Sequence, residues 1–514
     1  MTDQKDAYIA QLENTVKTLQ QQVSNLTEII LLMKKKQFGS SSEKTPKQED
    51  SIQINLFNEA EDIASEEAED PIARTVAGYI RKKSKTKREE LLKDLPVQEI
   101  IYEIAEEESY CPHCNGHLEV IGQEVVREQV QYIPAKIQIE RTIRKAYGCT
   151  KCKHHGTPYV IKAQTPAPVM NHSLASSSSV AHVMYQKYVN SVPLYRQEKD
   201  WEQMGIALSR GTMGNWVIKC SQDWFSPIIE KFKQELLKRQ VLHCDETTVQ
   251  VLKEAGKVPQ TKSYMWLYRT GADTGPPVVL FDYQPSRGGK NAAEYLKAFT
   301  GFLHTDAYSG YVKVMNVTRC CCWAHVRRYF IEAIPVTGKN KSLKTNAELG
   351  RDHCNKLFEI ERTLADLTPE LRKQARLEKE RAVLDDFWAW LDTLNPVNGS
   401  KLAKAVQYTK NQKAYLENYL LDGRCSISNN LAENCIRPFA VGRKNWLFSD
   451  TPRGADASAM VYSIIETAKA NDLNLYKYLN YLLTYMPGLE WRDYPEIFED
   501  LMPWSKKAQE ICKN

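Results

Sequence analysis

The order of strand-like and helix-like segments after residue 241 most restricts what this chain can fold into. Segments with the apolar patterning of strands cover, in order, residues 241–252, 263–270, 276–284, 302–308 and 318–323. A helical segment over 291–299 separates the third strand from the fourth, and another helix starts at Ala324. This order predicts a ribonuclease-H-like fold. In that fold the first and fourth strands are neighbours, so side chains on both can share one site.

Three acidic residues occupy distinctive positions relative to these segments. Asp245 lies in the first predicted strand within LHCDET, and Asp306 lies in the fourth within LHTDAYSGY. Glu433 follows the polar stretch SISNN, which predicts the start of a helix. Carboxylates are hard oxygen ligands of the kind Mg²⁺ prefers, and two such ions activate an attacking oxygen and stabilise a leaving one. If the fold brings the three together, they predict a site that breaks and rejoins phosphodiester bonds.

Each of these carboxylates also has a purely structural interpretation. Asp245 could end a strand, and Asp306 could cap a turn. Glu433 could belong to a capping box with Asn430, or pair with Arg437 one helical turn later. Spacing alone does not decide between these interpretations and a metal site.

Two further acidic residues compete with this trio. Glu246 adjoins Asp245, but alternation along a strand predicts that it faces the opposite side. Asp282 lies at the end of the third predicted strand. Both are therefore weaker candidates for the site.

The segment between the second and third acidic residues is long and charged. Its helical patterning predicts an all-helical insertion over 346–425, which divides the core into 237–345 and 426–470. Residues 471–514 form a predicted C-terminal helical region. The insertion lengthens the connection to the last acidic residue without preventing it from reaching the site.

The N-terminal segment, residues 1–38, has the repeat of a coiled coil. Apolar residues spaced alternately by three and four positions are Ile9, Leu12, Val16, Leu19, Val23, Leu26, Ile30 and Met33. An isolated helix would leave this stripe in water, so self-association is expected, with packing on the same chain as the alternative.

Residues 39–98 have the composition of a disordered linker, acidic over 48–70 and basic over 81–88. The basic run RKKSKTKR suits attraction to DNA phosphates, although a solvated charge run is the simpler interpretation.

Two CxxC pairs define a predicted zinc-binding domain over residues 99–165. The four cysteines are Cys111, Cys114, Cys149 and Cys152, separated by sheet-like sequence. Four thiolates from two such pairs supply the closed tetrahedral coordination that structural zinc prefers.

Residues 166–236 are helical in period and contain a candidate helix-turn-helix. We expect a first helix near 195–204, Gly205 in the turn, and a second helix from about Ser209. The residues expected to contact DNA from the second helix are Arg210, Thr212 and Asn215. Any helical hairpin can show these features, so an ordinary hairpin is the alternative.

Composition indicates a multidomain protein of a reducing compartment. The 514 residues allow several domains, and 69 basic against 64 acidic residues give a net charge of only +5. DNA contacts must therefore come from local clusters. Thirteen cysteines, three of them consecutive at 320–322, do not suit a disulfide framework. With no segment that predicts a membrane span, we expect a cytoplasmic, nucleoid-associated protein.

Long, ordered motifs over nearly the whole chain resemble those of one family, the transposases of the insertion-sequence sixty-six family. The motifs are KKKQFGSSSEK, CPHC with CTKC, PLYRQEKDWEQMGIALSRGTMGNWV, HCDET, HTDAYSGY, CWAHVRRYF and NNLAENCIRPFAVGRKNW. The resemblance implies a bacterial enzyme whose metal ligands are Asp245, Asp306 and Glu433, the DDE triad. It also implies Mg²⁺ as a pair of ions, with Mn²⁺ as a substitute, and companion proteins encoded by the same element.

The same resemblance assigns roles to residues around the triad. Cys322 and His325 match the CxxH signature of many DDE transposases, with a role in packing and positioning rather than zinc binding; a buried, hydrogen-bonded histidine is the alternative. Arg327 and Arg328 are candidates for DNA contact.

Downstream of the triad, positive charge alternates with an aromatic residue at Arg437, Arg443, Lys444 and Trp446. This pattern suits phosphates and an unstacked base, against a solvated basic turn. The basic run at 81–88 lacks the Gly-Arg-Pro core of an AT-hook, so only generic phosphate attraction is expected there.

These observations predict a multidomain α/β DNA transposase with a ribonuclease-H-like core. It would bind the terminal inverted repeats of its element in double-stranded DNA, cut at the ends and join them to target DNA, acting as at least a dimer. The alternatives are a nuclease of the same fold that only hydrolyses, and a zinc-containing DNA-binding regulator that has lost catalysis.

Overall fold

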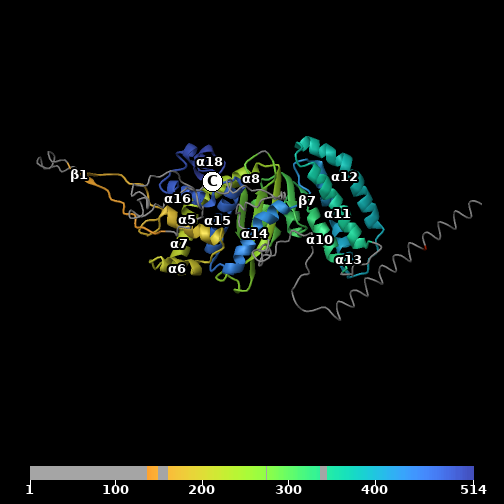
Figure 1. Cartoon of the computed structure of the whole chain (residues 1–514), viewed down its shortest axis with the longest axis horizontal. Helices are drawn as coiled ribbons and strands as arrows, with labels where there is room; N and C mark the ends of the chain where they lie inside the picture. The colour runs from red at the N-terminus through yellow and green to blue at the C-terminus, as the bar shows by residue number, and fades with distance from the viewer. Residues whose placement is uncertain (1–14, 16–135, 149–159, 274, 336–343, 514) are drawn as a thin grey trace, which may run out of the picture. The chain divides into compact units, whose positions relative to one another are not determined.

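The structure is a computed structural model that describes residue 15 and residues 136–148, 160–273, 275–335 and 344–513 (Figure 1). The chain divides into two units, and the elements described below belong to the unit that contains residues 140–514. The predicted coiled coil, apart from Thr15, and the linker over 39–98 lie outside the described residues. So do all four CxxC cysteines. Those predictions therefore stay predictions.

A five-stranded mixed sheet forms the centre of this unit. Its strands are β3 (Val241–Gln250), β4 (Lys262–Thr270), β5 (Val279–Gln284), β6 (Gly301–Thr305) and β7 (Val317–Cys321). They lie in the order β5-β4-β3-β6-β7. β3, β4 and β5 pair antiparallel, whereas β6 and β7 run parallel to β3. The expected pairing of the first strand with the fourth is confirmed.

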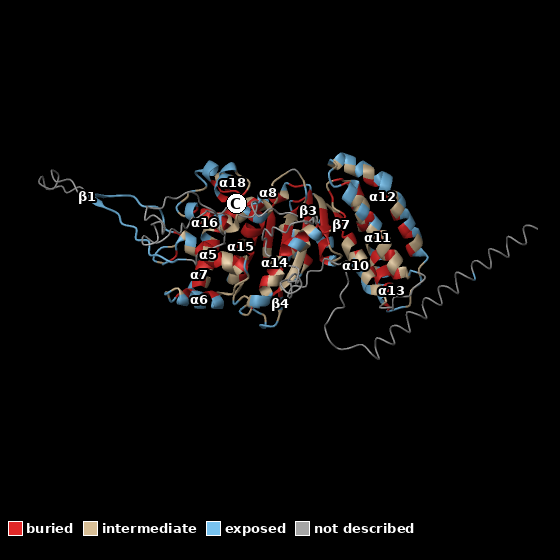
Figure 2. Cartoon of the chain, in the orientation of Figure 1, coloured by how far each residue is buried: buried red, intermediate tan, exposed pale blue. Residues whose placement is uncertain are grey.

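The strands form where continuous apolar runs demand burial. All of the first four residues of β3 are buried, which is typical of a strand covered on both faces. The connecting helices α9 (Gly289–Tyr295) and α10 (Trp323–Ala333) lie close to their predicted positions, although α9 begins and ends earlier than predicted. Figure 2 shows buried residues in the sheet and in the helices packed around it.

Two helices after the insertion complete the core. α14 (Asn430–Trp446) contacts β3 and β4, and α15 (Pro452–Ala470) lies against β5. Thr467 and Ser463 of α15 accept hydrogen bonds from the backbone N–H groups of Val279 and Phe281, at 3.0 and 2.7 Å. These buried bonds satisfy backbone groups at the outer edge of β5 that would otherwise lack partners.

The insertion is helical, as predicted. It contains α11 (Asn346–Thr363), α12 (Pro369–Asp392), α13 (Lys401–Leu416) and the 3₁₀ turn η4 (Asn418–Leu421). Arg376 of α12 is 1% exposed and pairs with Glu361 at 2.6 Å. Its guanidinium also donates to the carbonyls of Tyr419, Asp422 and Cys425. One buried side chain thus fixes the path by which the chain returns to the core.

The helices that precede β3 in the chain match the expected helix-turn-helix region. They are α5 (Ser177–Tyr188), α6 (Leu194–Gln203), α7 (Arg210–Cys220), the π-helical turn η2 (Ser221–Phe225) and α8 (Ser226–Leu237). Gly205 has φ +94° in the turn, and Ser209 caps α7 by accepting from the N–H of Thr212. The predicted helices and turn are confirmed; DNA contact by them remains a prediction.

The C-terminal region is helical, as predicted, with α16 (Leu475–Tyr485), α17 (Pro495–Asp500) and α18 (Lys506–Cys512). α16 packs against α5. A short antiparallel pair, β1 (Ala146–Gly148) and β2 (Val160–Lys162), flanks residues outside the description. Among the described helices, none is long and apolar enough to cross a membrane.

Candidate active site

The sheet places the first two predicted ligands side by side. β3 and β6 run parallel with His243 opposite His304. Two residues further along the same register, Asp245 lies opposite Asp306, which follows the last residue of β6. In neighbouring parallel strands, residues opposite each other lie at the same height along the strands. The carboxylates of Asp245 and Asp306 therefore lie at the same end of the β3–β6 pair.

The negative charges of the other two members of the trio act on Asp245. Burial raises the pKa of its carboxyl well above the usual range, and the nearby charges of Glu246, Asp306 and Glu433 raise it further. A hydrogen bond from the N–H of Glu246 to Asp245 Oδ1, at 2.8 Å, opposes that rise. Both other predicted carboxylates therefore lie close enough to Asp245 for their charges to act on it, and a cation bound nearby would offset this repulsion.

Asp306 is the more accessible strand carboxylate, with 29% of its side chain exposed. Its Oδ1 accepts a hydrogen bond from the N–H of Tyr308 at 2.9 Å, so the turn-capping interpretation holds for one oxygen. The other oxygen lies 4.0 Å from an Arg287 Nη2. One capped oxygen still leaves the second available to a ligand.

Glu433 lies in the first turn of α14, where the helix dipole favours a negative charge. Among the described residues its carboxylate pairs with Arg328 Nη2 at 3.4 Å, and His325 Nε2 lies 3.5 Å from it. Its Oε1 is buried and accepts no hydrogen bond within the described chain. Asn429, rather than Asn430, occupies the N-cap position, so Asn430 and Glu433 form no capping box. Among the described residues, Glu433 forms no ion pair with Arg437.

Asn429, which the sequence reasoning missed, positions that helix. Its side chain makes no cap bond to α14 and instead spans to β3. Nδ2 donates to the carbonyl of Cys244 at 2.8 Å, and Oδ1 accepts from His243 Nδ1 at 2.9 Å. Asn429 is 1% exposed, so these are dry bonds that fix the start of α14 beside Asp245. The polar doublet at 429–430 was the available signal.

The CxxH pair lies at the same junction. Cys322 is the N-cap residue of α10, and its Sγ accepts from the N–H of Asn429 at 3.1 Å. Ligating atoms of Cys322, His325 and Glu433 all lie within 4.8 Å of one another. Burial lowers the pKa of His325, which favours the neutral imidazole. Cys322 thus contacts Asn429 at the start of α14, and His325 contacts Glu433 in the first turn of that helix.

The competing carboxylates have other partners. Glu246 is 1% exposed at its side chain and accepts from Arg287 Nε at 2.8 Å and from the Tyr311 hydroxyl at 2.6 Å. Burial raises its pKa, with Asp306 adding to the effect. Asp282 lies on β5, two strands from β3, where burial raises its pKa to about 6. The Arg287 and Tyr311 contacts were not predicted.

The predicted DNA-contact residues of α10 and α14 divide into internal and exposed groups. Arg443 donates to the hydroxyls of Thr247 and Thr248 at 3.1 and 3.0 Å, and Arg327 Nε donates to Asn355 at 2.6 Å. Trp446 packs edge to face on Phe439, with ring centroids 5.6 Å apart. The exposed residues are Arg328, Arg437 and Lys444.

The three predicted DNA-contact residues of α7 are all exposed. Arg210, Thr212 and Asn215 lie on its solvent side, with the Arg210 guanidinium 5.6 Å from the ring centroid of Tyr195. Their side chains are therefore available to a partner.

Comparison with known proteins identifies the relatives of this chain. A model of the "Transposase IS66 family" matches residues 172–457. Models described as the zinc-finger binding domain of transposase IS66, the transposase C of IS166 homeodomain and the IS66 C-terminal element match 108–153, 25–100 and 463–504.

Individual relatives are more distant. Two proteins of Sinorhizobium fredii, the uncharacterized proteins y4qI and y4hP, are 28% and 26% identical over 98% and 91% of this chain. The matches span 93% and 86% of the two relatives. A solved structure, the Drosophila P element transposase strand transfer complex, aligns with a TM-score of 0.31 at 12% identity over 60% of this chain and 94% of its own.

Proposed function

Because the chain belongs to the IS66 transposase family, we propose that it cuts the ends of its insertion sequence and joins them to target DNA with a DDE active site. The catalytic residues are Asp245, Asp306 and Glu433. The proposal goes beyond the transposase role that membership gives, because it names the reaction and the residues that perform it.

The architecture of the core supports a ribonuclease-H-like assignment. The sheet order β5-β4-β3-β6-β7, with three antiparallel strands followed by two parallel ones, is the topology expected from the segment order. In such a core the first strand and the end of the fourth each supply one acidic residue, and a later helix supplies the third. β3, β6 and α14 stand in those places.

The observation that carries the proposal is the convergence of the trio. Asp245 and Asp306 share a level on neighbouring strands, and the charges of Asp306 and Glu433 act on Asp245. Three carboxylates gathered at a partly exposed site oppose folding unless a cation or a proton compensates them. Paired divalent cations provide that compensation and serve phosphodiester chemistry.

The donor set fits Mg²⁺. All three side chains offer hard oxygen atoms, and the buried Oε1 of Glu433 has no hydrogen bond in the described chain. When bound, the ions polarise the phosphodiester and stabilise charge on the attacking and leaving oxygens. The protein itself holds the carboxylates in place through Asn429, and His325 and Arg328 orient Glu433.

Exposed cationic side chains provide contacts for the DNA backbone. Arg328 pairs with Glu433, Arg437 lies one turn after Glu433 on α14, and Lys444 lies nearer the end of that helix. On α7, Arg210, Thr212 and Asn215 are suited to reading the inverted repeats. Arg327 and Arg443 act inside the protein in this proposal. Residues 1–38 would join at least two copies, so that both element ends are held together.

The test is strand transfer by the full chain in Mg²⁺. The substrates are a labelled precut end, taken from the inverted repeats beside the reading frame, and a target plasmid. Joined product is expected, and cleavage without joining would instead identify a hydrolytic nuclease. Asp245→Asn should lower joining by more than about 100-fold, because loss even of an outer-shell partner of a metal ligand costs about 10- to 100-fold.

Asp282 provides a matched control that separates loss of the proposed site from general damage to the fold. Asp282→Asn changes a buried acidic residue of the same sheet and should leave joining intact. End binding should persist in both variants. Undiminished joining by Asp245→Asn would reject the assignment, and absence of any cutting or joining by the unmutated chain would favour a regulator.

A further inference from the structure

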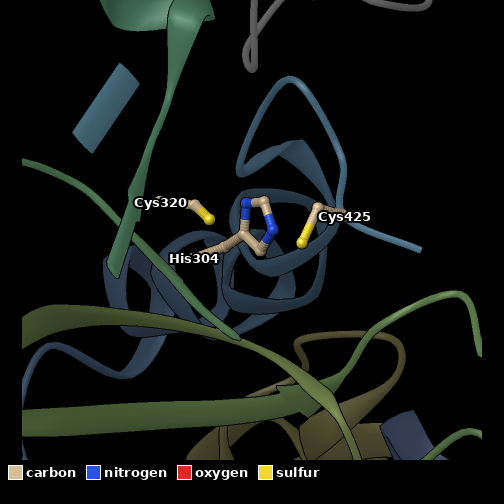
Figure 3. Close-up of side chains that lie close together, drawn as sticks. All are labelled: His304, Cys320 and Cys425. Atoms are coloured by element: carbon tan, nitrogen blue, oxygen red, sulfur yellow. The ribbon is translucent and has the colours of Figure 1, made fainter. Parts of the chain in front are cut away.

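A second cluster of metal-binding side chains lies beside the trio. His304 of β6, Cys320 of β7 and Cys425, which precedes α14, each offer a ligating atom, and these atoms all lie within 4.8 Å of one another. Figure 3 shows the His304 imidazole between the two sulfur atoms. The three residues are 0%, 1% and 1% exposed. They come from three separate segments, so the tertiary fold builds the cluster.

The imidazole at the centre has no other role in the described structure. Neither ring nitrogen of His304 has a hydrogen-bond partner among the described residues, although the side chain is fully buried. An unpaired buried polar group costs about 1–3 kcal/mol, so such a group calls for an explanation. One face of the ring stacks on His243 with centroids 4.4 Å apart, which leaves the nitrogens directed along the ring plane.

We propose that His304, Cys320 and Cys425 form a structural metal site for zinc or a similarly thiophilic ion, distinct from both the carboxylate trio and the CxxC pairs. Imidazole nitrogen and thiolate sulfur are the donors that zinc prefers. Zn–S bonds of about 2.3 Å and Zn–N bonds of about 2.0 Å place neighbouring ligand atoms less than about 4 Å apart, so the cluster needs only a small contraction.

Charge balance suits this buried location. Binding releases the two thiol protons to solvent, and two thiolates with one neutral imidazole then exactly offset the charge of Zn²⁺. A neutral complex avoids the large cost of burying an isolated ion. Within the described residues only three side chains belong to this cluster, so a water molecule would take the fourth position, as it does in zinc sites with three protein ligands rather than in closed four-ligand sites.

The site would hold together the segments that position the trio. His304 lies two residues before Asp306, and Cys320 lies two residues before Cys322. Cys425 lies a few residues before Asn429, at the end of the segment that returns to the core. Its carbonyl accepts a hydrogen bond from Arg376. Bound metal would therefore clamp β6, β7 and the approach to α14 at one point, acting on the active site by position only.

The test measures the zinc content of the full chain purified under reducing conditions. Cys425→Ser and His304→Gln should each lower the content by one zinc ion per chain. Cys354→Ser, which changes a buried cysteine of α11, should leave it unchanged. Equal content in all four proteins would overturn the proposal, and so would a Cys320–Cys425 disulfide in the unmutated chain.

A second measurement covers the case in which the ligand variants do not fold. In a full chain carrying serine at Cys111, Cys114, Cys149 and Cys152, the core cluster is untouched. That chain should still bind Co²⁺ with thiolate-to-cobalt absorption, which Co²⁺ at the carboxylate trio does not give, and adding Cys425→Ser to it should remove this absorption. Absence of the absorption before Cys425 is changed would reject the site. Both readouts are metal content, so they stand or fall independently of strand transfer.

Discussion

Replacing Asn429 with alanine tests whether the start of α14 is fixed by dry hydrogen bonds to β3. The substitution removes the donor to the Cys244 carbonyl and the acceptor for His243 Nδ1. Both partners are buried, so water does not replace the lost bonds. The first turn of α14, which carries Glu433, then loses its connection to the strand that carries Asp245.

The magnitude follows from the two groups left unpaired. Each buried polar group without a partner costs about 1–3 kcal/mol, so Asn429→Ala, which leaves two unpaired, should destabilise this junction by about 2–6 kcal/mol. At about 1.4 kcal/mol per tenfold change, the smaller value alone reduces protection of the local amides against hydrogen exchange about 30-fold. Strand transfer should fall as well, because Glu433 is no longer held beside Asp245.

The assay is native-state hydrogen exchange of the amides of Ala432 and Glu433, which donate to the Asn429 carbonyl. This local readout is preferable to global unfolding because a multidomain chain does not unfold in one step. Asn445→Ala is the control, since this residue of the same helix makes an exposed bond to the Ser191 carbonyl at 3.2 Å. The control should change exchange by less than about 0.5 kcal/mol.

The reasoning would be refuted if Asn429→Ala matched Asn445→Ala in both amide protection and strand transfer. That result would mean that packing of α14 on β3 and β4 alone holds the helix. A loss of joining with unchanged protection would also contradict it, since the proposed effect acts through position.

Two further substitutions test the packing and the electrostatics of the fold. Arg376→Leu leaves Glu361 without its buried partner, so the stability of the insertion should fall by about 3–5 kcal/mol. Proteolysis within residues 346–425 should therefore be faster than in the control Arg381→Leu, which changes a more exposed arginine of the same helix. Burial raises the pKa of Glu466 to about 7 from the 4.5 expected in the unfolded chain, so the folded state holds its proton longer and wild-type stability declines as the pH rises from about 4.5 to 7. The local stability of α15 in Glu466→Gln should therefore exceed that of wild type by up to about 3 kcal/mol at pH 8 and match it near pH 4, compared by native-state hydrogen exchange of the α15 amides at each pH; equal stability at pH 8 would contradict the shift.

The sequence alone could predict the order of the strands because that order depends on local apolar patterns, whereas the role of the trio stays a proposal. Apolar runs locate the strands, and the order of the segments gives the neighbours of β3. The prediction that Asp245 and Asp306 face one site follows from that order and agrees with the register. The helical insertion was predictable in the same way, since its helices are long and periodic.

Contacts between distant segments were beyond the reach of such patterns. Arg443 was expected at phosphates from its basic neighbourhood, yet its guanidinium bonds to Thr247 and Thr248, almost two hundred residues earlier. Asn429 similarly acts on Cys244. A local pattern reveals that a side chain is polar, but only tertiary structure reveals which partner it meets, so roles of individual polar residues need the fold.

The two outer strands of the sheet bear on how copies of this chain assemble. Thr467 and Ser463 occupy the β5 margin, and at the other margin Asn418 Nδ2 donates to the Arg319 carbonyl of β7 at 2.7 Å. Strand-to-strand annealing between protomers is thereby discouraged on both flanks. If the protein pairs two element ends as proposed, its copies would therefore have to meet through helical faces or the N-terminal segment rather than through their sheets.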